Sequence, residues 1–267
     1  MQPVRVERGN SPVILAFPHV GTELPTEVAD RLNEEGGLLR DTDWHIHRLY
    51  DGLLPEVTTV TAIQSRYVLD LNRDPSGVSL YPGQATTGLI PLTTFDNLPI
   101  WHEGREPADR DRDHWLNAVH RPYHDALSAE IARVKAVHGV AILYDCHSIR
   151  SHIPWLFDGR LPDFNIGTDG GATCAPELEA ETLRICQASA DHVTVLNGRF
   201  RGGWTTRHYG HPETGVHAIQ MELAQISHLA SEEPPFELHP ARSTRMREIL
   251  ADILNALAGL APRLVRP

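Results

Sequence analysis

The stretch VILAFPHVG, residues 13–21, decides the fold that the sequence predicts. Its five leading apolar residues have the length and composition of a buried strand, and Pro18 ends the run immediately before His19. The stretch VAILYDCHS, residues 140–148, repeats this pattern and places His147 just past its apolar run. We therefore predict two buried strands, each followed by a histidine at its carboxyl end.

These two histidines are candidate metal ligands. In α/β folds, ligand sites are built at the carboxyl ends of the strands, where His19 and His147 would meet. Neutral imidazole nitrogens are suitable ligands for zinc. The chain contains 16 histidines, however, and no short-range ligand motif joins these two. Two unrelated loop histidines are therefore the alternative to a metal site.

The composition excludes several classes of protein. The net charge is −11 and the sequence has no basic run, which argues against nucleic acid and anionic membrane surfaces as partners. No apolar run reaches the length of about 18 residues that a transmembrane helix needs, and residues 1–12 lack the apolar core of a signal peptide. The three cysteines show no Cys-x-x-Cys spacing. We expect a cytoplasmic protein, and a homo-oligomer is compatible with the sequence.

Helical and strand-like segments alternate along the 267 residues, which predicts a single α/β domain, residues 1–267. The expected strands are residues 13–17, 57–63, 67–71, 140–144, 193–196 and 216–223. The expected helices are residues 26–33, 41–54, 109–138, 176–189 and 241–257, with Pro122 kinking the third or beginning a new helix. Residues 75–106, 154–175 and 198–212 are expected to be irregular.

Three clusters of polar residues lie in or beside apolar segments, although packing of a hydrophobic core does not require polar side chains there. The stretch RYVLDLNRD, residues 66–74, reads as a strand that ends in arginine and asparagine, which suit the binding of a carboxylate. Glu222 lies in the apolar stretch AIQMEL, where a carboxylate is costly unless it is paired or functional. Residues 199–210 combine arginines with glycines, which allow close approach to an anion. The alternatives are surface charges at a strand end, an outward-facing acid and a basic surface loop.

The motifs together resemble the N-formylglutamate amidohydrolase (N-formylglutamate deformylase) family of histidine degradation, which is related to zinc carboxypeptidase-like amidohydrolases. The matching stretches are PHVGT (18–22), DTDW (41–44), DLNR (70–73), DCHS (145–148), FDGRLPDFN (157–165), GRFRGG (198–203), TRHYG (206–210) and QMELAQ (220–225). Some are weak individually, but their shared order is highly specific. The resemblance implies a three-layer α/β/α fold with a mixed central sheet, similar to zinc carboxypeptidases.

The resemblance also implies a reaction, the metal-dependent hydrolysis of the formyl amide of N-formyl-L-glutamate to L-glutamate and formate. The substrate would be a small anionic N-acyl amino acid. One alternative is the same fold acting on N-formyl-aspartate, N-acetyl-aspartate or N-succinyl-glutamate. The other alternative is a metal-stabilised binding protein without catalysis.

The resemblance implies a site for one divalent metal ion. Zn²⁺ is the most expected ion, and Co²⁺, Ni²⁺ and Mn²⁺ also suit these ligands. His19 and His147 would be two ligands. Related carboxypeptidases take a glutamate three residues after the first histidine, a position that Thr22 occupies here. Asp43 is the favoured third ligand, because the family motif carries an acid there. The alternatives are Asp41 and Glu23.

Two further roles complete the implied site. Glu222 would be the general base that takes a proton from the attacking water and passes it to the leaving amine. Arg66 would polarise the formyl oxygen. The implied substrate-binding residues are Asn72 and Arg73 for one carboxylate, and Arg201 or Arg207 for the second.

Overall fold

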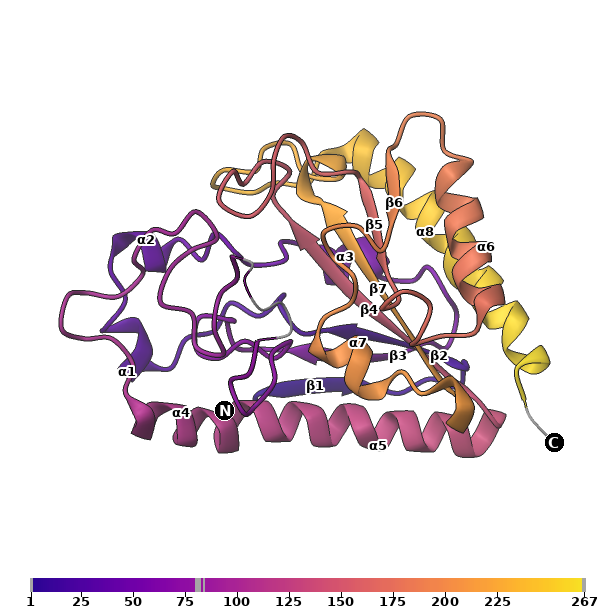
Figure 1. The fold of residues 1–267 in the computed structure, drawn as a ribbon, viewed down its shortest axis with the longest axis horizontal. Coiled ribbons are helices and arrows are strands. Elements are labelled where there is room, and N and C mark those ends of the chain that lie inside the picture. The colour runs from indigo at the N-terminus through magenta and orange to yellow at the C-terminus, as the bar shows by residue number, and fades with distance from the viewer. Residues whose placement is uncertain (1, 80–82, 84, 266–267) are drawn as a thin grey trace.

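The computed structural model describes residues 2–79, 83 and 85–265, which form a seven-stranded mixed sheet with helices on both faces (Figure 1). The strands, in the sheet order β1-β3-β2-β4-β7-β5-β6, are Val4–Glu7, Thr58–Ala62, Val13–Phe17, Ala141–Ile149, Val216–Ala224, Phe164–Gly167 and Thr194–Leu196. The central strands β3, β2, β4 and β7 run parallel, so their carboxyl ends lie at one edge of the sheet. Strands β1 and β5 pair antiparallel with β3 and β7.

The helices flank this sheet. The α-helices α1 to α8 are Thr26–Ala29, Glu34–Gly37, Ile46–Tyr50, Asp109–Trp115, Arg121–His138, Pro176–Gln187, Trp204–Tyr209 and Pro240–Leu260. A π-helical segment η1 spans Leu116–His120, and short 3-10 helices are η2 (Pro212–Thr214), η3 (Gln225–Ser227) and η4 (Ala261–Arg263). Among the described residues, no helix has both the length and the apolar character that crossing a bilayer requires.

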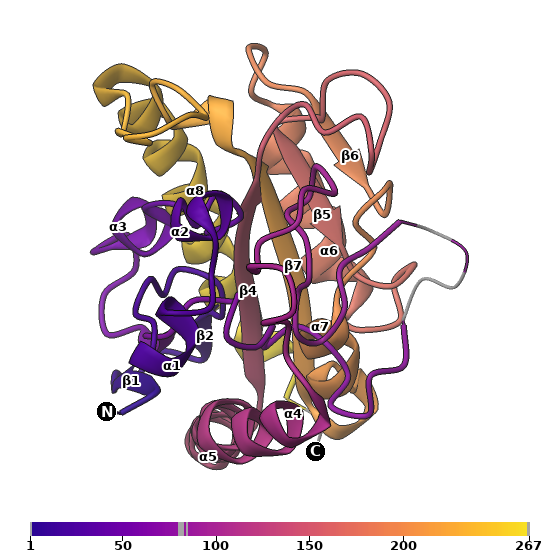
Figure 2. The same ribbon diagram turned by 90° about the vertical axis from the view of Figure 1, so that its left-hand side faces the viewer.

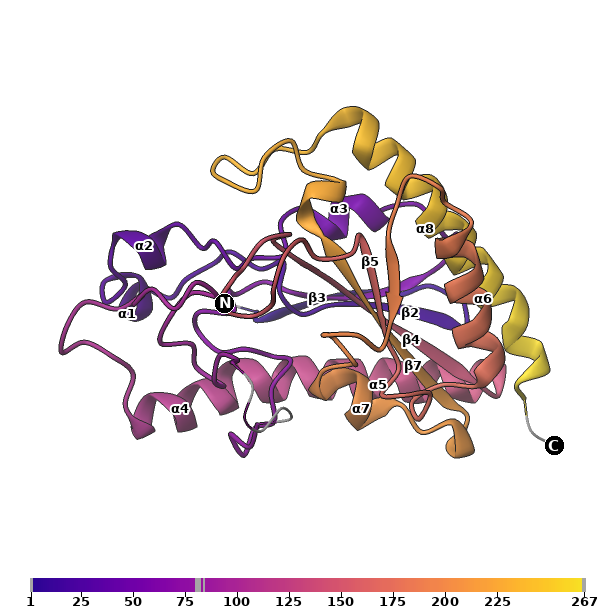
Figure 3. The ribbon, with the colours of Figure 1, turned by 45° about the horizontal axis from the view of Figure 1, so that its top comes forward.

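Strand β2 shows how the sequence builds three layers. All five of its residues are buried, and successive side chains point to opposite faces of the sheet. Val13, Leu15 and Phe17 pack in a core with residues of α3, α6 and α8. Ile14 and Ala16 pack in a second core with residues of α5. Figures 1 and 3 show α6 and α8 side by side, and Figure 2 shows α5 nearly end-on. The expected α/β/α layers with a mixed central sheet are confirmed.

The long helix expected over residues 109–138 consists of α4, η1 and α5 in direct succession. Pro122 explains the change in helix type, because its ring has no N–H to donate and crowds the preceding turn. The backbone forms a wider turn before Pro122, in which the Arg121 N–H donates to the Leu116 carbonyl five residues back. Pro122 thus lies in the first turn of a new helix, α5, directly after a π-helical segment, as one of the two expected alternatives predicted.

Two histidines of this helical segment hold the loop that carries Asn72. His124 Nε2 lies 2.9 Å from the Leu71 carbonyl oxygen, and His120 Nε2 lies 3.3 Å from the carbonyl oxygen of Arg73. Burial lowers the pKa of His124 to about 3. A neutral His124 therefore donates one hydrogen bond to the loop.

The prediction of a strand at residues 67–71 is wrong. Tyr67, Val68 and Leu69 are buried, but they lie in turns and irregular backbone. Asp70 donates its N–H to Leu89, in the long irregular segment, at 2.8 Å. Packing inside a loop region can bury an apolar run as completely as a sheet does, so the apolar pattern alone misleads here.

Other expected boundaries also differ. Strand β4 continues to Ile149 because it pairs with β7 over its whole length, so His147 lies within the strand. Residues 154–175 and 198–212 were expected to be irregular, but they contain β5 and α7. The expected helices at 26–33 and 41–54 shorten to α1 and α3, and β1 was not expected. The missed elements have four to six residues, too short for a clear periodicity.

The buried His124 gives the fold a pH dependence that can be measured. Because its pKa falls from 6.5 to about 3 on folding, its contribution to stability is present above pH 6.5 and is lost as the pH falls toward 3. We expect the free energy of unfolding of the wild type, relative to His124→Gln, to fall by about 1.4 kcal/mol per pH unit below pH ~6. Urea denaturation at pH 7, 6 and 5 measures this difference. A difference that does not change with pH would contradict the assignment of a buried neutral histidine.

Candidate active site

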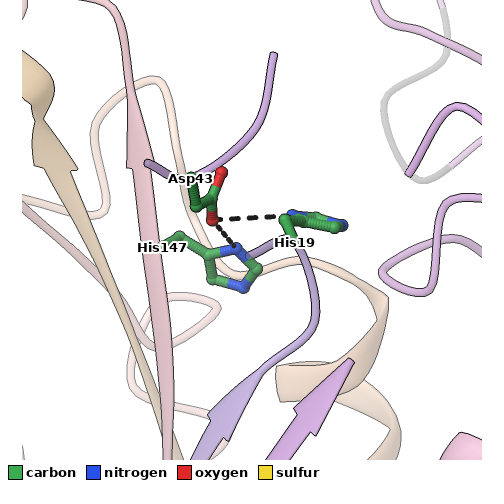
Figure 4. A group of neighbouring side chains, drawn as sticks. All are labelled: His19, Asp43 and His147. Atoms are coloured by element: carbon green, nitrogen blue, oxygen red, sulfur yellow. Dashed lines mark hydrogen bonds and ion pairs between the residues drawn. The ribbon is translucent and has the colours of Figure 1, made fainter. Parts of the chain in front are cut away.

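The structure brings His19, Asp43 and His147 together (Figure 4). Asp43 Oδ2 lies 3.2 Å from His147 Nδ1 and 3.7 Å from His19 Nδ1. The three side chains are at most 3% exposed, and their ligand atoms all lie within 4.8 Å of one another. One histidine follows β2, the other lies in β4, and Asp43 precedes α3, so three separate segments meet at the carboxyl edge of the sheet.

Each histidine is held by a second carboxylate. His19 Nε2 lies 2.8 Å from Asp70 Oδ1, and His147 Nε2 lies 3.0 Å from Asp145 Oδ2. A carboxylate that accepts the Nε2–H leaves the Nδ1 lone pair directed at the shared centre, which is the usual arrangement around metal-binding histidines. Burial alone would lower the pKa of His147, but the carboxylates of Asp145 and Asp43 raise it well above its usual value.

Of the three carboxylates considered for the third ligand, the structure places Asp43 beside the histidines. Asp41 is buried, but its Oδ2 accepts hydrogen bonds from the Tyr67 hydroxyl and the Phe95 N–H, both at 2.9 Å. Glu23 is exposed, so it does not share this buried centre. In the described part of the chain, Asp43 Oδ1 is buried and accepts no hydrogen bond.

The donor set fits a divalent metal ion. Two imidazole nitrogens and one carboxylate oxygen are ligands that zinc accepts, with a position left for water or substrate. Asp43, Asp70, Asp145 and Glu222 are all buried around this centre. Arg66 offsets part of their charge, because its Nη2 donates to Asp70 Oδ2 at 2.6 Å. A bound cation would offset more of it, as buried carboxylates require.

Glu222 lies next to His147 on the neighbouring strand. Strands β4 and β7 pair in parallel with these two residues as register partners. The Gln220 side-chain amide donates to Glu222 Oε2 at 3.1 Å. Burial raises the pKa of Glu222 to about 8, although His147 and Arg66 oppose this effect. The structure thus places a carboxylate with a near-neutral pKa beside the histidine pair.

A cleft of about 610 Å³ of empty space, partly open to solvent, extends from this centre. His19, His147 and Glu222 line one part of it. The arginines that line it are Arg66, Arg73 and Arg199. Apolar side chains, among them Phe95, Leu156 and Phe200, complete the wall. A small anionic molecule with an apolar middle is the type of ligand that such a lining accommodates.

Asn72 lies at the base of the cleft and is held in place by the loop around Gly203. Its Oδ1 accepts a hydrogen bond from the Thr205 N–H at 2.9 Å, and its amide nitrogen lies 3.3 Å from His147 Nε2. A Cβ on Gly203 would lie 2.3 Å from Asn72 Nδ2, so only glycine allows this close approach.

The two arginines predicted for the second carboxylate do not line this cleft. Arg201 is exposed, and Arg207 pairs with Asp169 at 3.3 Å. The chain turns at Gly202, whose φ of +106° is accessible to glycine, and Arg207 follows in α7, where its Nε donates to the Gly202 carbonyl at 2.9 Å. Arg199 lines the cleft instead. The sequence marked this loop as cationic, but it could not say which arginine faces inward.

Fold and site together define an α/β protein with a buried centre that could hold a divalent metal, beside an arginine-lined cleft. A sequence profile described as N-formylglutamate amidohydrolase matches residues 11–228, and the chain belongs to this family. It is 47% identical over 253 residues to the N-formylglutamate deformylase of Pseudomonas aeruginosa, with 94% of each chain covered. It is 44% identical over 251 residues to that of Pseudomonas putida, covering 94% of this chain and 93% of that one.

Solved structures show the same fold. The N-formylglutamate amidohydrolase of Ralstonia eutropha JMP134 superimposes with a TM-score of 0.81 at 22% identity, covering 98% of this chain and 99% of that one. A protein from Agrobacterium tumefaciens superimposes with a TM-score of 0.71 at 19% identity, covering 97% and 96%. The family resemblance of the sequence motifs is confirmed.

Metal analysis can test the ligand set. We expect His19→Ala, His147→Ala and Asp43→Asn to retain less added zinc than the wild type, because each removes one donor of a three-residue group that could hold a metal. Glu23→Gln is the matched control, since it alters an exposed carboxylate of the same N-terminal region and should retain the metal. Mass spectrometry of the dialysed proteins measures the zinc content. A full equivalent of zinc in Asp43→Asn would remove Asp43 from the ligand set.

Proposed function

We propose that this protein hydrolyses the formyl amide of N-formyl-L-glutamate, giving L-glutamate and formate, and that it requires a divalent metal ion. One observation carries the proposal: the buried group His19, Asp43 and His147 lies beside Glu222 at the base of an arginine-lined cleft, in a chain of this family. The proposal includes a cytoplasmic location, a role in histidine degradation and a homo-oligomeric assembly.

His19, His147 and Asp43 would hold the metal, with zinc as the first candidate and Co²⁺, Ni²⁺ and Mn²⁺ as alternatives. The metal, when bound, supplies a positive charge that makes water more acidic and polarises an amide carbonyl. Asp70 and Asp145 would fix the orientation of the two imidazole rings through their Nε2 atoms.

Glu222 would move the proton. A carboxylate with a raised pKa is suited to accept a proton from water and then donate it to the nitrogen of the leaving amine. The hydrogen bond from Gln220 to Oε2 orients the carboxylate. A cation beside Glu222 would lower its pKa toward the range in which it acts as a base at neutral pH.

Arg66 would stabilise the developing negative charge on the formyl oxygen. Its guanidinium is buried and fixed by Asp70 Oδ2 and, at 3.3 Å, by the Asp41 carbonyl. A cation that is already fixed needs no reorganisation when charge develops, which is the basis of electrostatic catalysis. Arg73 and Asn72 would bind one carboxylate of the substrate, next to this end of the cleft.

A panel of substrates tests the reaction. We expect formate release from N-formyl-L-glutamate, and its loss when a chelator removes the metal. The panel includes N-formyl-L-aspartate, N-acetyl-L-aspartate and N-succinyl-L-glutamate, which represent the same fold with another substrate. Faster turnover of one of these would replace the proposed substrate. No turnover of any of them by the zinc-loaded protein would favour a binding protein.

Glu222→Gln tests the proton transfer. The change keeps the size of the side chain and removes the base, so we expect kcat to fall by about 10²- to 10⁴-fold while the zinc content stays at the wild-type level. Formate release and metal analysis on the same sample separate the two effects. Glu27→Gln, at an exposed position of α1, is the control for a general effect of the exchange. Loss of zinc in Glu222→Gln would make Glu222 a ligand instead of the base.

A further inference from the structure

The cleft must bind an anion although its base is strongly acidic. Asp43, Asp70 and Glu222 are buried there, and glutamate adds two carboxylates of its own. A dianion enters such a cleft only if cationic side chains offset its charge. Among the described residues that line the cleft, the arginines are Arg66, Arg73 and Arg199.

Two of these arginines lie at the reacting end. Arg66 contacts Asp70 at 2.6 Å and has its Nη1 3.8 Å from Asp43 Oδ1. The Nη2 of Arg73 lies 3.6 Å from Asp70 Oδ2. Both guanidiniums are therefore tied to the carboxylates around the metal ligands, where the formyl amide and the carboxylate next to it would lie.

Arg199 comes from a different element, the loop that follows β6. Its Nε donates to the Leu156 carbonyl at 3.1 Å and its Nη2 donates to the Ala85 carbonyl at 2.8 Å. These two contacts with backbone oxygens hold the guanidinium in a fixed orientation at the cleft. The side chain is half-buried and faces the cleft.

The wall around Arg199 is apolar. Phe200 and Leu156 line the cleft next to it, and Ile149 and Phe95 line it as well. A chain of methylene groups fits such a wall, and a carboxylate at its end would meet the guanidinium. From this arrangement, and on the basis of the proposed function, we infer that Arg199 binds the side-chain carboxylate of the substrate and sets the preference for an acidic amino acid.

The inference assigns the binding of the side-chain carboxylate to Arg199 instead of Arg201 or Arg207. Variants of all three arginines can test this assignment. The measured quantity is the ratio of kcat/KM for N-formyl-L-glutamate to that for N-formyl-L-glutamine, which has the same shape and the same α-carboxylate but a neutral side chain. We expect this ratio to fall by about ten- to a hundredfold in Arg199→Gln, because one charge-assisted hydrogen bond is lost. Arg199→Lys should restore part of the ratio, since an ammonium retains the charge but not the planar fork.

Three further variants complete the experiment. Arg201→Gln and Arg207→Gln test the two rivals, and Arg110→Gln, at an exposed position of α4, is the control for a general effect of losing an arginine. All three should leave the ratio unchanged. A fall of the ratio in Arg201→Gln or Arg207→Gln, without one in Arg199→Gln, would overturn the inference.

The substrate pair also separates a structural role from a role in specificity. If Arg199→Gln lowers kcat/KM equally for both substrates, Arg199 only supports the loop and the inference is wrong. If Arg199→Gln does not fold, the Arg199→Lys ratio decides, and a ratio equal to that of the wild type overturns the inference. If the wild type cleaves both substrates equally well, the inference fails while the amidohydrolase activity stands. If the wild type releases formate from neither, the proposed function itself fails.

Discussion

The burial of four carboxylates around two histidines is the constraint on which the rest of the site depends. Asp43, Asp70, Asp145 and Glu222 are almost completely shielded from water, which is unfavourable unless each has a partner. The imidazoles of His19 and His147 partner three of them, and Arg66 supports a further contact with Asp70. The remaining negative charge explains why this arrangement suits a divalent cation. It also explains why an anionic ligand needs arginines that reach the cleft from outside this centre.

The sheet fixes the relative positions of the side chains that form this centre. His147 and Glu222 are register partners on two parallel strands, so main-chain hydrogen bonds fix the spacing between a ligand and the proposed base. Asp145 lies two residues before His147 on the same face of β4, which lets its carboxylate reach the ring of that histidine. His19 and Asp43 approach from segments that pack on this edge, and the Asp43 N–H donates to the carbonyl of His19 at 3.0 Å.

The sequence could predict the parts that rest on long apolar patterns. The runs at residues 13–17 and 216–223 correspond to β2 and β7, because continuous burial leaves a clear signal. The run at 67–71 was buried by loop packing, which leaves the same signal without a strand. The carboxylates behind the histidines were missed, although Asp145 shares a strand face with His147. The arginine of this loop that lines the cleft, Arg199, could not be predicted, because residue type alone does not say which side chain of a loop faces a cleft.

Strands and loops supply different parts of the site, and this limits which side chains can be exchanged. The groups assigned to bond cleavage, such as His147 and Glu222, are fixed by the paired main chain of β4 and β7. A one-residue slip in either strand would turn its side chain to the opposite face. Arg199 lies in a loop, and two of its contacts are with backbone carbonyls, which any neighbouring residue type supplies. Under the proposed function, exchange of this one loop side chain would change the amino-acid preference and leave the paired strands that hold His147 and Glu222 unaltered.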